Sequence, residues 1–189
     1  MQEEGDFMRV VAGTLRSRKI EAVEGLETRP TSDKIKEAIF SRIGPYFQGG
    51  LMLDGYSGSG NMAIEAISRG IEKTIVCEVN SLAVKTIKKN CQTLKISEQV
   101  EIKQRDVERY LSETELVFDL IYLDPPYLEQ KNEELMKIIN QRSLLNQDGH
   151  LVIESRKQDE FADQVGQLIK VKEAVYGITK ITYYLKEEK

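Results

Sequence analysis

The stretch LDGYSGSGNMAIEA, residues 53–66, decides the fold of this chain. A short apolar strand over residues 51–56 runs into three glycines, and a helical pattern follows over residues 61–70. Glycines suit a tight turn, and they also let a ligand press against backbone N–H groups. The spacing G-x-x-G-x-G differs from the dinucleotide pattern G-x-G-x-x-G. Asp54, before the first glycine, would repel a pyrophosphate, so the loop favours a ligand that carries an ammonium group.

The rest of the chain alternates between apolar strands and helical patterns of about 10–15 residues. Helices of this kind are predicted over residues 80–96, 132–141 and 160–169, and strands over 73–79, 100–106, 116–124, 149–155 and, as a hairpin, 169–185. Strands that alternate with helices pair in parallel and are covered on both faces. We therefore predict an α/β fold with a doubly wound, mostly parallel seven-stranded sheet and an antiparallel C-terminal edge.

An N-terminal extension precedes this pattern. Residues 8–24 alternate like two short strands, and the following segment predicts a helix that Thr31 or Ser32 can cap. We expect a β-hairpin and helix extension over residues 1–45 and the main α/β domain over residues 46–189.

The composition is that of an ordinary soluble globular chain. Of the 189 residues, 40% are hydrophobic and 31% are charged, and no apolar run approaches the roughly 20 residues that span a bilayer. The N-terminus lacks a signal-peptide pattern, so we expect a cytoplasmic protein with no membrane contact. Two cysteines and one histidine fit neither a disulfide framework nor a metal site, and we expect no metal.

The charge of the chain is uneven. The net charge of −4 argues against a nucleic-acid partner, yet residues 9–19 contain no acid and four cations, Arg9, Arg16, Arg18 and Lys19. One interpretation is a charged hairpin edge that resists pairing with other strands. The other is a surface that contacts phosphates.

Acidic residues lie at the carboxyl ends of four of the predicted strands: Asp54, Glu78, Asp106 and Asp124. Ligands of open α/β sheets bind at this carboxyl edge. Glu78 can accept hydrogen bonds from ribose hydroxyls or face water, and Asp106 can hold an adenine amine or cap the next helix. Four acids would repel each other unless a ligand with several donors lay among them. S-adenosylmethionine offers an ammonium, ribose hydroxyls, an adenine amine and a sulfonium, whereas a dinucleotide offers two phosphates.

These features together resemble a known family. DGYSGSG at residues 54–60, Glu78, Asp106 and DPPY at residues 124–127 stand in an order similar to that of class I S-adenosylmethionine-dependent methyltransferases. The resemblance implies a Rossmann-like fold with S-adenosylmethionine as the methyl donor. DPPY resembles the [DNS]-P-P-[YF] motif of enzymes that methylate an exocyclic or side-chain amide nitrogen.

The chemistry of the DPPY stretch agrees with this resemblance. An aromatic amine is a weak nucleophile because its lone pair is delocalised into the ring. The prolines fix φ and lack N–H groups, so the Asp124 carboxylate and the Pro125 carbonyl are held as acceptors for the two N–H bonds. Tyr127 can stack on the base, which contributes roughly 1–3 kcal/mol. The alternative is a rigid surface turn.

The sequence of the N-terminal extension resembles a more specific family within this class. MRVVAGTLRSRKI at residues 8–20 and TRPTSDKIKEAIFSRI at residues 28–43 are similar to the N-terminal signature of RsmD-type guanine-N2 methyltransferases of bacterial small-subunit ribosomal RNA. The chain departs from that pattern at Leu15, where the family often has an aromatic residue, at Asn61-Met62 and at Tyr127. The resemblance covers nearly the whole chain and implies that the basic extension grips rRNA.

The residues and the resemblance together define the sites that we expect. The cofactor site comprises Asp54, Gly55, Ser57, Gly58, Gly60, Glu78, Val79, Asp106, Val107 and Asp124. The catalytic site comprises Asp124, Pro125, Pro126 and Tyr127, with Thr31 nearby. The residues expected to bind RNA are Arg9, Arg16, Arg18, Lys19 and Arg29.

The expected function is methyl transfer to N2 of a guanine in 16S rRNA, free or in a partly assembled small subunit, by a monomer. The same motif also allows methylation of adenine N6 or another amine in DNA or another RNA. DNA enzymes of that kind usually carry an added recognition domain, for which we expect no room here. A non-enzymatic module that binds an adenosine ligand would not need the DPPY stretch.

Overall fold

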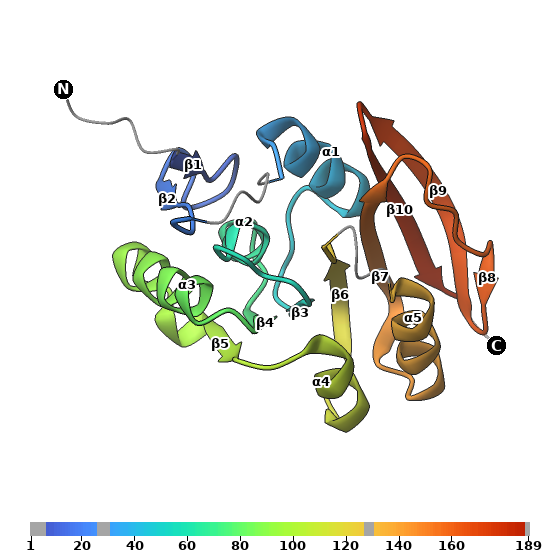
Figure 1. Ribbon diagram of the computed structural model, residues 1–189. Helices are drawn as coiled ribbons and strands as arrows, with labels where there is room; N and C mark the ends of the chain where they lie inside the picture. Colours follow the sequence, from blue (N-terminus) through green and yellow to red (C-terminus); the bar gives the residue numbers. More distant parts are fainter. Residues whose placement is uncertain (1–6, 26–30, 127–130, 188–189) are drawn as a thin grey trace.

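The computed structural model describes residues 7–25, 31–126 and 131–187 (Figure 1). One sheet has the strand order β5-β4-β3-β6-β7-β10-β9-β8, in which β3 to β7 are parallel and the last three strands antiparallel. Its strands are β3 (Leu51–Asp54), β4 (Lys73–Cys77), β5 (Val100–Lys103), β6 (Phe118–Leu123), β7 (Leu145–Arg156), β8 (Gln164–Val165), β9 (Leu168–Tyr176) and β10 (Thr179–Lys186). The predicted doubly wound sheet with an antiparallel edge is confirmed.

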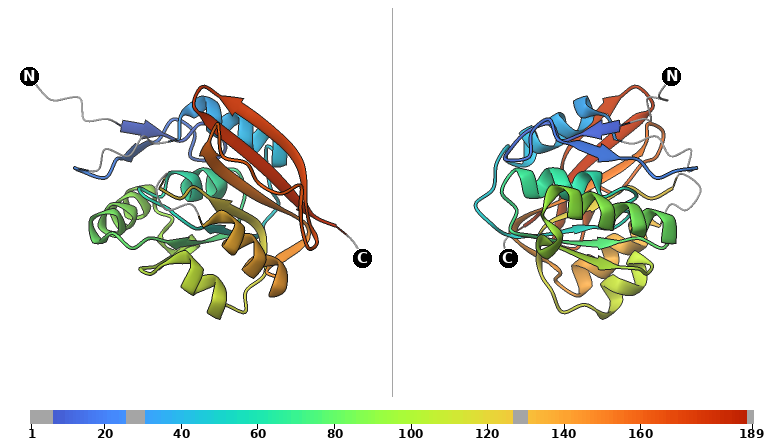
Figure 2. Two further views of the ribbon diagram at one scale, coloured as in Figure 1. Left: turned by 45° about the vertical axis from the view of Figure 1, so that its right-hand side comes forward. Right: turned by 90° about the vertical axis from the view of Figure 1, so that its left-hand side faces the viewer.

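Helices cover both faces of the sheet (Figure 2). One face carries α1 (Asp33–Ile43), α2 (Asn61–Ser68) and α3 (Ser81–Leu94), and the other carries α4 (Val107–Glu113) and α5 (Asn132–Gln141). A short 3₁₀ helix, η1 (Ser97–Gln99), precedes β5. Among the described residues no helix is long and apolar enough to cross a membrane.

Neighbouring side chains of the central strands alternate between two apolar clusters. Met52 and Leu120 pack towards α1 and α2, whereas Leu53, Ile121 and Leu123 pack towards α4 and α5. This follows from the two-residue period of a strand. The same alternation continues past the strand ends, so it decides to which face each acid of the carboxyl edge points.

Side-chain caps fix where three helices begin. The Ser32 hydroxyl accepts a hydrogen bond from the backbone N–H of Ile35 (3.3 Å), Asn80 caps α3, and Asp106 caps α4 through the N–H of Arg109 (3.1 Å). Short polar side chains at this position satisfy N–H groups that have no partner within the helix. Of the two caps predicted for α1, Ser32 is the one used.

The helix predicted over residues 160–169 is wrong, and the sheet has eight strands, not seven. The segment instead forms β8 and a tight turn into β9, with Val165 paired to Leu168. Gly166 lies at φ +60°, a left-handed conformation that ends any helix. The side chain of Asn140 in α5 accepts a hydrogen bond from the N–H of Gln167, 2.8 Å away, so a tertiary contact holds the turn.

The N-terminal hairpin consists of β1 (Phe7–Arg9) and β2 (Lys19–Glu21), which pair antiparallel as predicted. Its loop lies directly against α2: the N–H of Thr14 donates to the carbonyl of Ser68 (2.8 Å), and the N–H of Leu15 to its hydroxyl (2.9 Å). Gly13 lies at φ +86°, and a Cβ on it would come within 1.8 Å of the Ser68 carbonyl oxygen. The close approach therefore requires glycine at this position.

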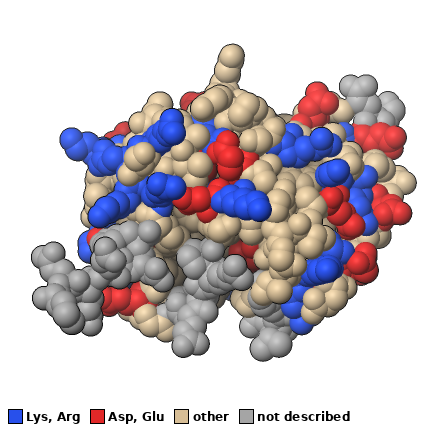
Figure 3. All heavy atoms as spheres, turned by 90° about the horizontal axis from the view of Figure 1, so that it is seen from above, with Lys and Arg blue, Asp and Glu red and all other residues tan. Residues whose placement is uncertain are grey.

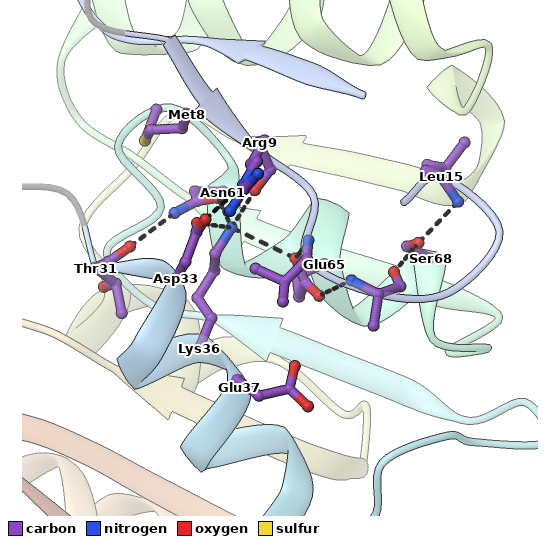
Figure 4. A network of polar contacts seen from close by, with 12 residues as sticks. Met8, Arg9, Leu15, Thr31, Asp33, Lys36, Glu37, Asn61, Glu65 and Ser68 are labelled. Atoms are coloured by element: carbon purple, nitrogen blue, oxygen red, sulfur yellow. Dashed lines mark hydrogen bonds and ion pairs between the residues drawn. The ribbon is translucent and has the colours of Figure 1, made fainter. Parts of the chain in front are cut away.

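A buried ion pair joins the hairpin, α1 and α2 (Figure 4). The ammonium of Lys36 lies 3.4 Å from the carboxylate of Glu65, and both side chains are fully buried. The same carboxylate accepts hydrogen bonds from the N–H groups of Val11 (2.8 Å) and Ala12 (3.0 Å) and from Arg69 (2.8 Å). Burial lowers the pKa of Lys36, and the charges of Glu65 and Asp33 oppose that shift.

Helix α1 shares an apolar cluster with the central strands. Ile39 and Phe40 are buried against Met52, Leu120 and Val152. The helix is therefore part of the core that covers this face of the sheet. The division of the chain at residue 45 into an extension and a main domain stays a prediction.

We predict that Gly13→Ala destabilises the fold more than Gly177→Ala. Both glycines have positive φ, but a Cβ on Gly177 meets nothing within 4 Å. The strain of the left-handed conformation, about 1 kcal/mol, is common to both. The contact with Ser68 is not, so chemical denaturation should give a larger loss of unfolding free energy for Gly13→Ala. Equal losses would contradict the close approach.

Candidate active site

Three acids lie on one face of the sheet, near the carboxyl ends of the neighbouring strands β3, β6 and β7. Asp54 pairs with Tyr122, and Leu123 pairs with Ile153, so Asp124 and Glu154 follow at the same level of β6 and β7. The alternation of a strand directs all three towards the face that carries α1 and α2. We call Asp54, Asp124 and Glu154 the acid row.

The glycine loop wraps the end of β3. The N–H of Gly55 donates to the carbonyl of Tyr122 (2.9 Å), and the N–H of Ser57 to that of Cys77 (3.1 Å). A Cβ on Gly55 would come within 2.6 Å of the Leu123 side chain, whereas one on Gly58 would meet nothing within 4 Å. Gly60 caps α2 in the left-handed conformation. The first glycine is thus needed for packing, while Gly58 borders open space.

Asp54 is buried at the centre of this loop. Its Oδ2 accepts a hydrogen bond from the Ser57 hydroxyl (3.0 Å), and its Oδ1 has no hydrogen-bond partner in the part of the chain that the structure describes. Burial raises the pKa of Asp54 to about 7, the Ser57 hydrogen bond opposes the shift, and the charge of Glu78 adds to it. Buried polar atoms in proteins nearly always have a hydrogen-bond partner, so Asp54 Oδ1 can accept a hydrogen bond from a ligand.

The other predicted cofactor residues take different positions. The Glu78 carboxylate accepts hydrogen bonds from the N–H groups of Gly58 and Asn80, both 2.8 Å long, so it braces the glycine loop. Val79 is 65% exposed beside it. Asp106 is exposed and caps α4, and the Val107 side chain is buried in the apolar core. A cofactor role for these residues stays a prediction.

Asp124 follows the last residue of β6 and is partly buried. Burial raises its pKa well above the ordinary value for aspartate, and the charges of Glu154 and Asp54 raise it further. Pro125 is buried and Pro126 is exposed. Tyr127 and Arg29, which we predicted to contact the base and the RNA, lie outside the described residues.

A cluster of three hydrogen-bonded side chains lies beside Asp124. The Tyr122 hydroxyl donates to Glu154 Oε2 (2.5 Å), and the Thr31 hydroxyl lies 3.2 Å from that oxygen and 3.3 Å from the tyrosine oxygen. Burial, followed by the charge of Glu154, raises the pKa of Tyr122 well above its ordinary value, so the hydroxyl keeps its proton. Tyr122 and Glu154 were not predicted as site residues. The sequence signal for Glu154 is an acid near the end of the fifth apolar strand.

The cations of the hairpin differ in their partners. Arg9 pairs with Asp33 (2.6 Å), and Arg18 donates to the backbone carbonyl of Thr93 at the end of α3 (3.3 Å). Arg16 and Lys19 are exposed, and no ion pair joins the Arg16 guanidinium to any described residue. Arg9 is therefore already neutralised by a carboxylate, whereas Arg16 offers its full charge to a partner.

The residues at this edge fit S-adenosylmethionine. Asp54 offers an unused acceptor to an ammonium, Glu78 and Asp106 offer carboxylates to hydroxyl and amine donors, and Gly58 leaves room for a ligand against the backbone. A cation beside Asp54 would offset the burial and the nearby charge of Glu78 that raise the pKa of this carboxyl. Within the described residues no group of three or more His, Cys, Asp and Glu could hold a metal.

This fold and carboxyl edge define a class I S-adenosylmethionine-dependent methyltransferase. A solved RNA methyltransferase from Salinibacter ruber in complex with S-adenosyl-L-homocysteine has the same fold, with a TM-score of 0.66, 17% identity and coverage of 85% of this chain and 95% of that one. A conserved hypothetical protein from Streptococcus pyogenes aligns with a TM-score of 0.77 and 35% identity, covering 80% of this chain and 95% of its own.

The chain belongs to the family described as conserved hypothetical protein 95, whose model matches residues 8–185. The Bacillus subtilis protein YlbH is 41% identical over 95% of this chain and 99% of its own length. Ribosomal RNA small subunit methyltransferase D of Haemophilus influenzae is 32% identical over 79% of each chain. The resemblance to the RsmD-type enzymes is thereby confirmed, and S-adenosylmethionine is the methyl donor.

We predict that S-adenosylhomocysteine, which keeps the ammonium of the methyl donor, binds more tightly as the pH rises from 6 to 8. Asp54 must lose its proton before it can pair with the ammonium, and its pKa is about 7. Affinity should rise about tenfold over this range. Asp54→Asn should bind weakly with a flat profile, as measured by titration calorimetry.

The unliganded protein should show the opposite trend. Because folding raises the pKa of Asp54, the contribution of this group to stability is full below about pH 4 and is lost as the pH rises through about 7. Asp54→Asn should abolish that part of the decline. Identical binding profiles for the two proteins would show that Asp54 does not pair with the ammonium.

Proposed function

We propose that this protein transfers a methyl group from S-adenosylmethionine to the exocyclic N2 of a guanine in 16S rRNA of the small ribosomal subunit. One observation carries the proposal: Asp54 and Asp124 lie on the same face at the ends of the neighbouring strands β3 and β6, with Asp124 two residues beyond Tyr122, the strand partner of Asp54. A cofactor ammonium held by the first would bring the methyl donor next to an amine held by the second. The relative named small subunit methyltransferase D supports rRNA as the substrate class.

In this proposal Asp124 and Pro125 hold the amine. The carboxylate and the proline carbonyl accept one N–H bond each, so the nitrogen lone pair is freed from the purine ring. Neither Pro125 nor Pro126 has an N–H group that could compete for these acceptors. S-adenosylmethionine, when bound, supplies a methyl group on a sulfonium, and the chain contributes mainly position and alignment.

Asp124 also provides a destination for a proton. Once N2 has gained a methyl group it carries one proton too many, and the acid that holds it is the nearest acceptor. A carboxylate with a raised pKa takes up a proton more readily than an exposed aspartate. Tyr122 and Thr31 keep Glu154 hydrogen-bonded beside it, so the acid row stays in place when a positive charge enters.

The hairpin supplies a contact for RNA in this proposal. Its loop is fixed against α2 by the contacts of Ser68, so its cations have a defined position relative to the active site. Arg16 is exposed, and Arg18 reaches α3 with one guanidinium nitrogen. Cations at this place can neutralise phosphates while the target base leaves its stack to reach Asp124.

We predict that Asp124→Ala and Asp124→Asn keep the affinity for S-adenosylhomocysteine and lower methyl transfer by roughly 10²–10⁴-fold. Transfer is measured with radiolabelled donor on 16S rRNA and on small subunits, and the product nucleoside is identified by mass mapping. Glu134→Gln, which changes an exposed acid of α5, is the matched control. Near-normal transfer by the Asp124 variants would contradict the mechanism, and N6-methyladenosine as the product would contradict the assigned base.

We predict that Arg16→Glu with Arg18→Glu weakens binding to 16S rRNA. The slope of log affinity against log salt should flatten by about one for each phosphate that the variant no longer neutralises. The control is Lys137→Glu with Lys172→Glu, which reverses two exposed cations on α5 and β9. Affinities that match in the two double variants would leave the hairpin with a structural role only.

A further inference from the structure

Two segments of this acidic protein contain cations and no acids. Residues 9–19 form the hairpin loop and its flanks, and residues 80–97 contain α3 with Lys85, Lys88, Lys89 and Lys95. Together the two segments hold eight of the 27 lysines and arginines and none of the 31 acids, in a chain with a net charge of −4. In these two segments the positive charge is therefore not offset by acids along the chain.

The fold brings these two segments into contact. Arg18 donates to the carbonyl of Thr93 in α3 (3.3 Å), and the Asn90 side chain of α3 makes two hydrogen bonds with the backbone of Glu21. Apolar residues of the hairpin and of α3 share one cluster, which includes Ile20 and Ile87. Hairpin and α3 thus form one continuous surface, and lysines and arginines gather at that end of the molecule in the view from above (Figure 3).

Most lysines of the α3 segment have no carboxylate partner within the described part of the chain. Of the four, only Lys89 forms an ion pair with a described residue, Glu21 (2.7 Å). Around α4, by contrast, the cations lie against acids, as with Arg105 and Arg109 on Glu113. Lys85, Lys88 and Lys95 are exposed and keep an unneutralised charge.

We propose that α3 is a second RNA-binding element, whose exposed lysines bind the phosphate backbone of the rRNA that flanks the target guanine. This inference rests on the proposed function and extends its RNA contact from the hairpin to the far edge of the sheet. Lys85 and Lys88 lie one turn apart on the same helix face, and Lys95 lies about 15 Å further along from Lys85. A backbone strand that follows the hairpin onto α3 meets cations along that whole length.

Phosphate is the partner that this surface fits. The helix exposes lysines with little large apolar area, apart from Leu82 at its first turn, so it has no apolar stripe for a partner protein. Lysine acts as a point charge that binds phosphates without reading sequence. The surface therefore contributes affinity and orientation, while the choice of base stays with the active site.

The test is Lys85→Glu with Lys88→Glu, compared with the control Lys137→Glu with Lys172→Glu, which changes the net charge equally. Binding to transcribed 16S rRNA is measured at several salt concentrations, with S-adenosylhomocysteine affinity and thermal unfolding as checks on the fold. We expect an affinity at least tenfold lower than that of the control, with a salt slope flatter by about two. The KM for rRNA should rise while kcat stays within twofold.

Each outcome bears on one proposal. Equal affinity and equal salt slope in the two double variants would overturn the role of α3, even if methyl transfer to guanine is found. Wild-type protein that does not bind 16S rRNA would also overturn it. Loss of affinity together with methylation of a different base would support the α3 surface and overturn the assigned base. A variant that unfolds early is replaced by Lys85→Gln with Lys88→Gln, for which the same change in slope and a smaller loss of affinity are expected.

Discussion

The buried ion pair between Lys36 and Glu65 is the interaction on which the arrangement of this protein depends. It lies where the hairpin loop, α1 and α2 meet, and Glu65 also accepts the backbone N–H groups of Val11 and Ala12. Removing Glu65 would leave Lys36 and Arg69 without their shared buried carboxylate, at a cost of about 3–5 kcal/mol. Because three segments share the pair, the hairpin cannot move away from the sheet without uncovering it.

Asn61 connects this ion pair to the candidate active site through hydrogen bonds. Lys36 donates to the side chain of Asn61 (2.9 Å), and Asn61 donates to the backbone carbonyl of Thr31 (3.4 Å). Thr31 then contacts Glu154 and Tyr122 next to Asp124. A continuous set of hydrogen bonds therefore links the basic hairpin to the acid row, so the positions that we propose to bind RNA and the base are structurally connected.

The acid row and the surface formed by the hairpin and α3 carry charges of opposite sign. The acid row is a place where like charges are held together by the fold, with raised pKa values at Asp54 and Asp124 that a bound cation would relieve. The hairpin and α3 hold unneutralised cations at the other end. The net charge of −4 thus conceals a local acidic site and a separate surface of exposed cations.

The order of strands and helices, the glycine loop and the acids that follow each strand could be predicted from the sequence, because these are local patterns. The segment over residues 160–169 could not, since a left-handed Gly166 and the Asn140 side chain override its helical spacing. Glu154 and Tyr122 were missed because strand register, which the sequence does not state, sets them beside Asp124. By itself the sequence determined the fold class and the acidic residues at the carboxyl edge of the sheet. Only the tertiary structure decided which side chains meet, since burial and register depend on contacts between distant residues.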